Sequence, residues 1–178
     1  MIYVYAGQKP TLGKNVFIAP GARIIGAVTL GDEVSVWYNA VLRGDSDAIV
    51  VGARVNIQDL SVVHTDPGLV VQIEDDVTVG HSCVLHGCRI GAGSLIGIGT
   101  VVMNRAVIGE SCLVAANSLV TEGKVFPSHT LIMGSPARVA RELTPQELEK
   151  LKKSSAGYVK RAAEHRAAGV GGGSPKEE

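Results

Sequence analysis

Aliphatic residues recur along this chain at intervals of six positions. Eighteen of them form a ladder between positions 12 and 120, and the residue four positions beyond each rung is usually small or β-branched. A repeat of this kind buries its apolar side chains only by stacking on neighbouring copies of itself, so a period sustained over most of the chain predicts a solenoid. The rungs are Leu12, Ile18, Ile24, Leu30, Val36, Leu42, Val51, Ile57, Val63, Ile73, Val79, Leu85, Ile90, Ile96, Val102, Ile108, Val114 and Val120.

Three hexads make one turn of a triangular prism, and the eighteen rungs therefore predict about six turns. Each side of the triangle is expected to be a short strand, with strands of successive turns stacked about 4.8 Å apart and the rungs pointing inward. Corners that need a positive φ would be formed by glycines such as Gly91, Gly93, Gly97 and Gly99. The predicted fold is an all-β solenoid, a parallel β-helix.

The ladder loses its period at three places. The step lengthens to nine after Leu42 and to ten after Val63, and it shortens to five after Leu85. The two longer steps predict loops at 44–46 and 65–68 that project from the prism.

The hexad repeat is expected to end at Val120. Further along, Thr144, Pro145 and Glu147 form a helix-start pattern of N-cap residue, proline at the first helical position and glutamate three residues after the cap. The apolar positions that follow share one face, which predicts an α-helix packed along a side of the solenoid and ended by Gly169. The expected organisation is a β-helix over 1–125, a connecting turn over 126–143, the helix over 144–168 and a flexible tail over 169–178.

The charge balance argues against two classes of partner. Lysine and arginine together number 17, as do aspartate and glutamate, so the formal net charge is zero. Such a chain offers no basic face for nucleic acid and no polybasic patch for anionic lipid. The apolar start at 1–5 is too short for a signal peptide, and no apolar run reaches membrane-spanning length. We expect a soluble, cytoplasmic protein with neither nucleic acid nor membrane as a partner.

The chain has three cysteines, an odd number. Cys83 and Cys112 occupy repeat positions, which predicts small buried apolar residues rather than a disulfide framework. Cys88 lies outside the repeat and is a candidate reactive thiol.

Two of the five histidines fall in the same phase of the repeat. His64 follows the rung Val63 by one position and His86 follows Leu85 by one, each on the third strand of its turn. Both side chains should point outward about 5 Å apart, a separation at which two imidazoles can share one metal ion. We therefore predict that His64 and His86 are metal ligands.

A third histidine, His81, follows the rung Val79 by two positions, on the second strand of its turn. Five extended residues separate it from His86, a span of more than about 15 Å that one chain does not close. If all three histidines bind one ion, His81 comes from a neighbouring copy, and prisms packed around a threefold axis provide three such sites. Three neutral imidazoles without a fourth protein ligand are typical of a catalytic Zn²⁺ site with an open position, and Fe²⁺ or Co²⁺ would fit as well.

Other polar residues share these phases. Arg43 and Asp59 each stand one turn before a candidate ligand, so Arg43 of one copy is expected to form an interfacial ion pair with Asp59 of the next. Asp45 is a candidate to orient Arg43. Gln58 is either a hydrogen-bond partner of metal-bound water or an ordinary polar residue of a strand.

Three segments together resemble the motifs of the gamma-class carbonic anhydrase family. They read VLRGD at 41–45, NIQD at 56–59 and VGHSCVLHGC at 79–88, with His64 between the second and the third. The resemblance runs from about residue 8 to residue 165 and implies a homotrimer of left-handed β-helices.

The family resemblance also assigns roles to single residues. His64 and His86 of one subunit and His81 of the next would hold the metal, the division that the repeat phase also gives. The remaining implied roles are an interfacial pair between Arg43 and Asp59, contact of Gln58 with metal-bound solvent, and approach of the helix residue Tyr158 to the site.

The implied reaction is the reversible hydration of carbon dioxide to bicarbonate by a metal-bound hydroxide. The archetypal archaeal member of the family relays protons through glutamates on an extended loop, whereas the segments 45–47 and 65–68 contain no glutamate. Slow turnover is therefore expected.

Two alternatives remain open on the sequence. A hexapeptide-repeat acyltransferase or thioesterase acting on coenzyme A esters would use one histidine as a general base without metal, and residues 134–138 resemble the turn of such transferases. A catalytically silent scaffold would use the metal only to hold the trimer together.

Overall fold

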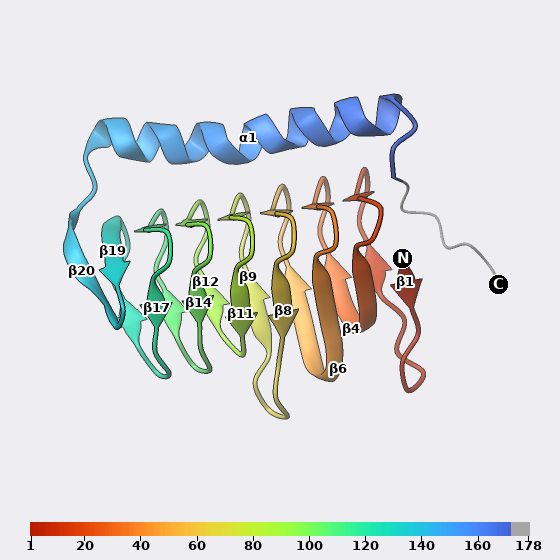
Figure 1. The fold of residues 1–178 in the computed structure, drawn as a ribbon, viewed down its shortest axis with the longest axis horizontal. Coiled ribbons are helices and arrows are strands. Elements are labelled where there is room, and N and C mark those ends of the chain that lie inside the picture. The colour runs from red at the N-terminus through yellow and green to blue at the C-terminus, as the bar shows by residue number, and fades with distance from the viewer. Residues whose placement is uncertain (172–178) are drawn as a thin grey trace.

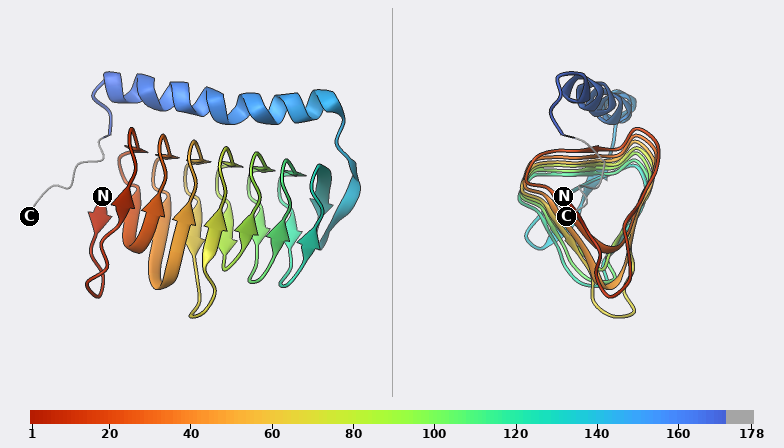
Figure 2. Two further views of the ribbon diagram at one scale, coloured as in Figure 1. Left: turned by 180° about the vertical axis from the view of Figure 1, so that it is seen from behind. Right: turned by 90° about the vertical axis from the view of Figure 1, so that its right-hand side faces the viewer.

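The computed structural model describes residues 1–171 as a parallel β-solenoid with a triangular cross-section and a single helix beside it (Figures 1 and 2). The predicted fold class is confirmed, and the architecture is consistent with the left-handed β-helix that the resemblance implies. The parallel strands on one side of the prism number seven, which gives about seven turns instead of six.

We name the three sides of the prism face A, face B and face C. Two long strands, β4 (Arg23–Leu30) and β6 (Val41–Val51), bend from face A onto face B and join them into a twelve-stranded sheet, while face C is an eight-stranded sheet. Face A also contains β1 (Ile2–Tyr3), β8 (Val62–His64), β11 (Val84–His86), β14 (Val101–Val102) and β17 (Leu119–Val120). Face B also contains β2 (Thr11–Leu12), β9 (Val71–Ile73), β12 (Arg89–Ile90), β15 (Val107–Ile108) and β18 (Val125–Phe126). Face C contains β3 (Phe17–Ile18), β5 (Ser35–Val36), β7 (Asn56–Ile57), β10 (Thr78–Val79), β13 (Leu95–Ile96), β16 (Leu113–Val114), β19 (Thr130–Gly134) and β20 (Ala137–Glu142).

The rungs of successive turns stack directly on one another. On face C, Val79 of β10 pairs with Ile57 in the turn before and with Ile96 in the turn after, and the other faces follow the same rule. All predicted rungs except Leu12, in the first turn, are buried. Removing each such side chain from water stabilises the fold by about 1.5–3 kcal/mol before entropy is counted, so these inner columns are the core of the protein.

The coil continues beyond Val120, contrary to expectation. β18 and β19 stack in parallel on β15 and β16 and place Phe126 and Ile132 at two further buried rungs. The step of six is intact here, but an aromatic ring replaces the aliphatic side chain at the first of these rungs. Instead of a connecting turn over 126–143, the chain completes another turn, and β20 then folds back antiparallel on β19.

The two expected loops have different outcomes. Residues 65–68 project from the prism between β8 and β9, as predicted (Figure 2, right). Residues 44–46 do not form a separate loop, because β6 stays extended as it bends around the corner between faces A and B and Gly44 pairs with Gly26 of β4. A Cβ atom at Gly26 would lie 2.3 Å from the carbonyl oxygen of Gly44, so this close stacking requires glycine.

The helix α1 (Pro145–Ala167) begins at the predicted N-cap. Thr144 and Glu147 form the expected capping box, in which each side chain accepts a hydrogen bond from the other residue's backbone N–H. α1 lies over face C and runs back along the solenoid to its N-terminal end (Figure 1). Its buried residues are Leu151, Ser155 and Ala162.

The helix ends close to the predicted position. Its C-cap is Ala168, followed by Gly169 with a φ of +72°. Of the tail expected over 169–178, residues 172–178 lie outside the described part of the chain. Within residues 1–171, no helix has both the length and the apolar character needed to cross a membrane.

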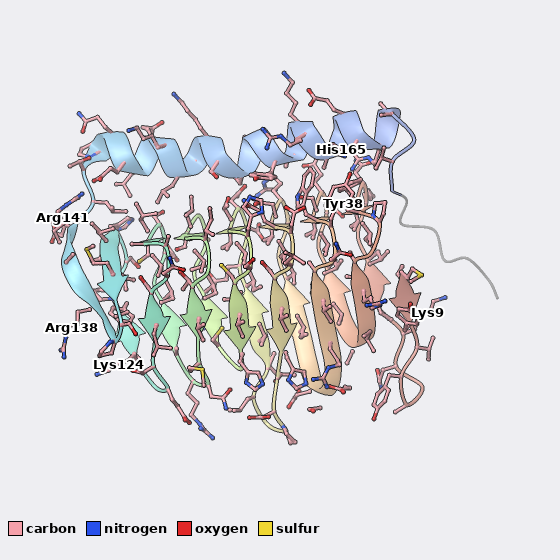
Figure 3. The ribbon with its side chains drawn as sticks, in the orientation of Figure 1. Lys9, Tyr38, Lys124, Arg138, Arg141 and His165 are labelled. Carbon is pink, nitrogen blue, oxygen red and sulfur yellow. The ribbon has the colours of Figure 1, made fainter. Side chains whose placement is uncertain are left out.

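An aromatic cluster fixes the C-terminal half of α1 to face C. The ring of His165 lies edge-on to Phe17 and Trp37, with centroid distances of 5.6 and 5.1 Å. In Figure 3, His165 on α1 lies above Tyr38 on the solenoid, and the Tyr38 hydroxyl lies 3.1 Å from Nδ1 of His165. Trp37 also makes an edge contact with Tyr158 at 5.4 Å, so the cluster holds that tyrosine in place.

Candidate metal centre

His64 and His86 lie directly opposite each other on neighbouring strands of face A. The strands β8 and β11 hold them in register, at the edge of face A that borders face B. Nδ1 of His64 lies 3.0 Å from Nε2 of His86, and the ring centroids are 5.0 Å apart. The structure therefore brings together the two histidines that share a phase of the repeat.

Asp45 contacts His64 on its other side. One carboxylate oxygen lies 3.0 Å from Nε2 of His64, and the other forms an ion pair with Arg43 of the same chain. Burial acts to raise the pKa of Asp45, but the hydrogen bonds from Arg43 and His64 outweigh it and lower that pKa below its ordinary value. Because an ionised carboxylate only accepts hydrogen bonds, Asp45 favours the neutral tautomer of His64 that carries its proton on Nε2 and presents a lone pair at Nδ1.

Asn104 contacts His86 in a comparable way. Oδ1 of Asn104 lies 2.6 Å from Nδ1 of His86, and Nδ2 of Asn104 donates a hydrogen bond of 2.9 Å to Asp66. Neither Asn104 nor Asp66 is among the site residues that the sequence pattern predicts. The signal for Asn104 was present, because it follows the rung Val102 by two positions in the turn next to that of His86.

His81 lies at the opposite edge of face A, at the corner with face C. Its Nδ1 is 2.8 Å from the carboxylate of Asp59, which occupies the same corner one turn earlier. The side chain of His81 is 45% exposed, compared with 17% for His64. In the part of the chain that the structure describes, no three His, Cys, Asp or Glu side chains are grouped so that they could hold a metal ion. One chain thus brings two of the predicted ligands together and leaves the third apart.

Gln58 lies beside Asp59, just after β7. Its side chain is buried, and its Nε2 donates a hydrogen bond of 3.1 Å to Oδ1 of Asn56. Asn56 in turn donates to the hydroxyl of Thr78, which lies 3.1 Å from the hydroxyl of Ser154 on α1. The helix therefore helps to hold this polar chain of side chains in place.

Tyr158 reaches the same corner from α1. Burial raises the pKa of its phenol, the positive charge of Arg161 opposes this, and the carboxylate of Asp59 raises the pKa further. The guanidinium carbon of Arg161 lies 5.1 Å from the centre of the Tyr158 ring. Its edge contact with Trp37, which precedes Gln58 by one turn in the same column, places the tyrosine on the side of the site that carries His81.

The cysteines take no part in this centre. Cys83, Cys88 and Cys112 are all free and buried. Burial raises the pKa of Cys88 to about 12 and that of Cys83 to about 11, which leaves very little of the reactive thiolate at neutral pH. Cys88 is a core residue, and the interpretation of it as a reactive thiol is wrong.

The chain is similar to known proteins in its repeat and over most of its length. The family described as bacterial transferase hexapeptide (six repeats) matches residues 9–44 and 87–122. A carbonic anhydrase of Geobacillus kaustophilus is 42% identical over 94% of this chain and 92% of its own length. A protein of Methanocaldococcus jannaschii named "Probable carbonic anhydrase" is 50% identical over 84% of this chain and 94% of its own length. Gamma carbonic anhydrase 2 of Arabidopsis thaliana mitochondria is 38% identical, and the match covers 89% of this chain and 59% of that protein.

The fold and the paired histidines define a hexapeptide-repeat β-helix protein with a candidate metal centre. Its sequence identity to these relatives over most of its length shows that the chain belongs to the gamma-class carbonic anhydrase family, whose enzymes are lyases. A solved structure, of a hexapeptide transferase family protein from Anaplasma phagocytophilum, is 44% identical with a TM-score of 0.90, covering 93% of this chain and 98% of that one.

Proposed function

We propose that the protein is a homotrimer that hydrates carbon dioxide reversibly to bicarbonate at a metal ion held between subunits. His64 and His86 of one copy and His81 of the next would hold the metal. The observation that carries this proposal is the direct opposition of His64 and His86 on adjacent strands, with their ring nitrogens 3.0 Å apart.

The protonation of the two rings supports a metal between them. The carboxylate of Asp45 leaves a lone pair at Nδ1 of His64, and the bond from His86 to the amide oxygen of Asn104 leaves a lone pair at Nε2 of His86. Two lone pairs that face each other at 3.0 Å repel unless a cation or a proton lies between them. Two nitrogens bound to one tetrahedral zinc lie about 3.3 Å apart, close to the observed spacing.

The outward side chains of face A support its role as the subunit interface. Val41, Val62, Val84, Val101 and Leu119 stack on five successive turns and are only partly covered in the single chain. On face C, by contrast, the outward residues near the start of the solenoid are buried under α1, and on face B they include charged and polar side chains. A continuous aliphatic stripe left partly exposed on one side is typical of a surface that packs against another chain.

The distribution of the ligands also fits a ring of three copies. His64 and His86 lie at one edge of face A, and His81 lies at the other edge of the same face. A head-to-tail interface brings one edge of each copy against the other edge of the next, and it closes into a ring under threefold rotation. Arg43 lies at the edge that carries His64, and Asp59 lies at the edge that carries His81. Each closed interface would therefore also bring Arg43 of one copy to Asp59 of the next.

The donor set favours zinc and leaves Fe²⁺ or Co²⁺ compatible, since all three bind neutral imidazole. When bound, such a metal supplies an activated water nucleophile at neutral pH, because it lowers the pKa of water from about 15.7 to about 7. The chain's own residues would orient the reactants: Gln58 is held by Asn56, and Tyr158 is held by Trp37. No glutamate lies in the segments 45–47 or 65–68, so we propose that proton transfer limits the rate.

Stopped-flow measurement of carbon dioxide hydration by the zinc- or iron-loaded protein tests this proposal. We expect hydration above the buffer rate, and loss of both metal and activity in His81→Ala with the solenoid still folded. A metal-loaded trimer that is no faster than buffer would leave only the scaffold role. A wild-type protein that binds no metal would contradict both.

The acyltransferase alternative has less support. The solved N-acyltransferase AntD of Bacillus cereus, in complex with coenzyme A, is 18% identical to this chain at a TM-score of 0.69, a likeness of fold alone. A general base needs no second imidazole in contact with it. The pairing of His64 with His86 therefore favours the metal-dependent reaction.

A further inference from the structure

We propose that Asn104, anchored by Asp66, is a positioning residue that fixes the ring of His86 so that Nε2 faces the metal. This inference rests on the metal site proposed above and deepens it. Neither residue belongs to the motifs at 41–45, 56–59 and 79–88.

The orientation of the Asn104 amide follows from the chemistry of its two neighbours. A carboxylate accepts hydrogen bonds and donates none, so Asp66 must face the amide nitrogen of Asn104, at 2.9 Å. The amide oxygen is thereby turned toward His86, at 2.6 Å from Nδ1. An amide oxygen only accepts, and Nδ1 of His86 must therefore carry the proton. The lone pair of the ring is left on Nε2, the atom that faces His64.

The backbone at Gly87 leaves room for this contact. A Cβ atom at Gly87 would lie 2.5 Å from Oδ1 of Asn104, and the residue has a φ of +52°. Any side chain at this position would push the amide away from His86 and strain the backbone as well. The glycine that directly follows His86 is thus matched to the asparagine one turn later.

The anchor of Asn104 also ties the projecting loop to the site. Asp66 lies in the loop over 65–68, and the backbone N–H of Gly68 donates a hydrogen bond of 2.8 Å to the carboxylate of Asp47 in β6. The loop is therefore fastened at two points, to β6 and to the residue that holds His86. Outer partners of this kind, which orient a ligand through its second ring nitrogen, typically change metal affinity 10–100-fold when removed.

Zinc affinity, measured by chelator competition on the full-length protein, tests the proposal. We expect Asn104→Ala to bind zinc about 10–100-fold more weakly than wild type. Asn15→Ala removes an exposed asparagine at the corner between faces B and C, away from the histidines, and should leave zinc affinity unchanged. Thermal unfolding of both variants reports whether the fold survives.

A charge-exchanged pair separates positioning from a general effect on structure. In Asp66→Asn/Asn104→Asp the carboxylate accepts from His86, and the new amide at 66 donates to it, so the hydrogen-bond pattern is restored with the same total charge. We expect this double variant to regain most of the zinc affinity lost in Asn104→Ala. A double variant that binds zinc no better than Asn104→Ala would overturn the proposal, as would an Asn104→Ala protein that matches wild type.

The position of the proton on His86 can be read without any metal. Nitrogen-15 NMR of histidine-labelled, metal-free His64→Ala protein, in which no second lone pair opposes Nε2 of His86, should show the Nδ1–H tautomer for His86, and adding Asn104→Ala should abolish it. An unchanged tautomer would contradict the role of Asn104 even if zinc binds. Failure of wild type to bind zinc, with the tautomer change still observed, would instead contradict the proposed function.

Discussion

The carboxylate of Asp59 lies 2.8 Å from Nδ1 of His81, so the exposed histidine is oriented within its own chain. A carboxylate at Nδ1 fixes the proton there and leaves Nε2 with a lone pair. Nε2 is then the nitrogen that His81 offers to a neighbouring copy. Each of the three histidines therefore has an oxygen acceptor beside one ring nitrogen: Asp45 and Asn104 are hydrogen-bond partners of His64 and His86, and Asp59 makes a close ionic contact with His81.

Removal of Asp59 should weaken the metal site without unfolding the coil. We expect Asp59→Ala to lower zinc affinity about 10–100-fold, because the ring of His81 loses the acceptor that orients it. The matched control is Asp75→Ala, an exposed aspartate at a corner away from the histidines, which should bind zinc as wild type does. Chelator competition measures both, and equal affinities for the two variants would contradict the orienting role of Asp59.

A charge on face A should break the assembly, whereas the same charge on face B should not. Val62 on face A and Val50 on face B are similarly exposed in the single chain, at 38% and 41%. We expect Val62→Asp to be a folded monomer, because trimer formation would bury an unpaired carboxylate. Val50→Asp should remain a trimer. Light scattering after size-exclusion chromatography gives the masses, and a trimeric Val62→Asp would show that face A is not the interface.

The start of α1 should contribute to stability in a pH-dependent manner. The hydrogen bond from Arg141, together with the cap residue Thr144, lowers the pKa of Glu147 from 4.5 to about 2. A carboxyl group whose pKa is lower in the folded state stabilises that state fully above its unfolded pKa. This stabilisation is lost as the pH falls from about 4.5 toward about 2.

Glu147→Gln removes the titration but keeps the shape of the side chain. Wild type should therefore resist urea better than the variant at pH 7, and the difference between their midpoints should shrink as the pH falls through this window. A difference that stays constant with pH would mean that the ion pair between Arg141 and Glu147 does not stabilise the folded state.

Most of the fold, and the pairing of the histidines on face A, could be predicted from the period of the repeat. Counting from rungs placed His64 opposite His86 and Arg43 beside His64, because strand register in a solenoid follows directly from the period. The sequence did not predict the seventh turn, because Phe126 interrupts the run of aliphatic rungs, although it follows Val120 by the same step of six residues.

The contacts that the sequence did not reveal involve residues whose position the period does not determine. Asp66 lies in an insertion between two rungs, and the path of an inserted loop depends on contacts such as that between Gly68 and Asp47. Similarly, a step of nine residues after Leu42 is compatible with either a loop or an extended strand bent around a corner, and β6 takes the second form. The position of Tyr158 near this corner depends on how α1 docks, which its packing in the aromatic cluster decides.

Subunit mixing tests the central claim, that each metal site is completed by a second copy of the chain. His81→Ala and the double variant His64→Ala/His86→Ala should each bind no zinc alone, since each lacks part of every site. When the two are unfolded together and refolded as mixed trimers, one interface in each mixed ring joins an intact His64 and His86 to an intact His81. We predict that zinc binding returns in the mixture. If mixed trimers form and still bind no zinc, the three histidines do not meet across an interface, and the account is wrong.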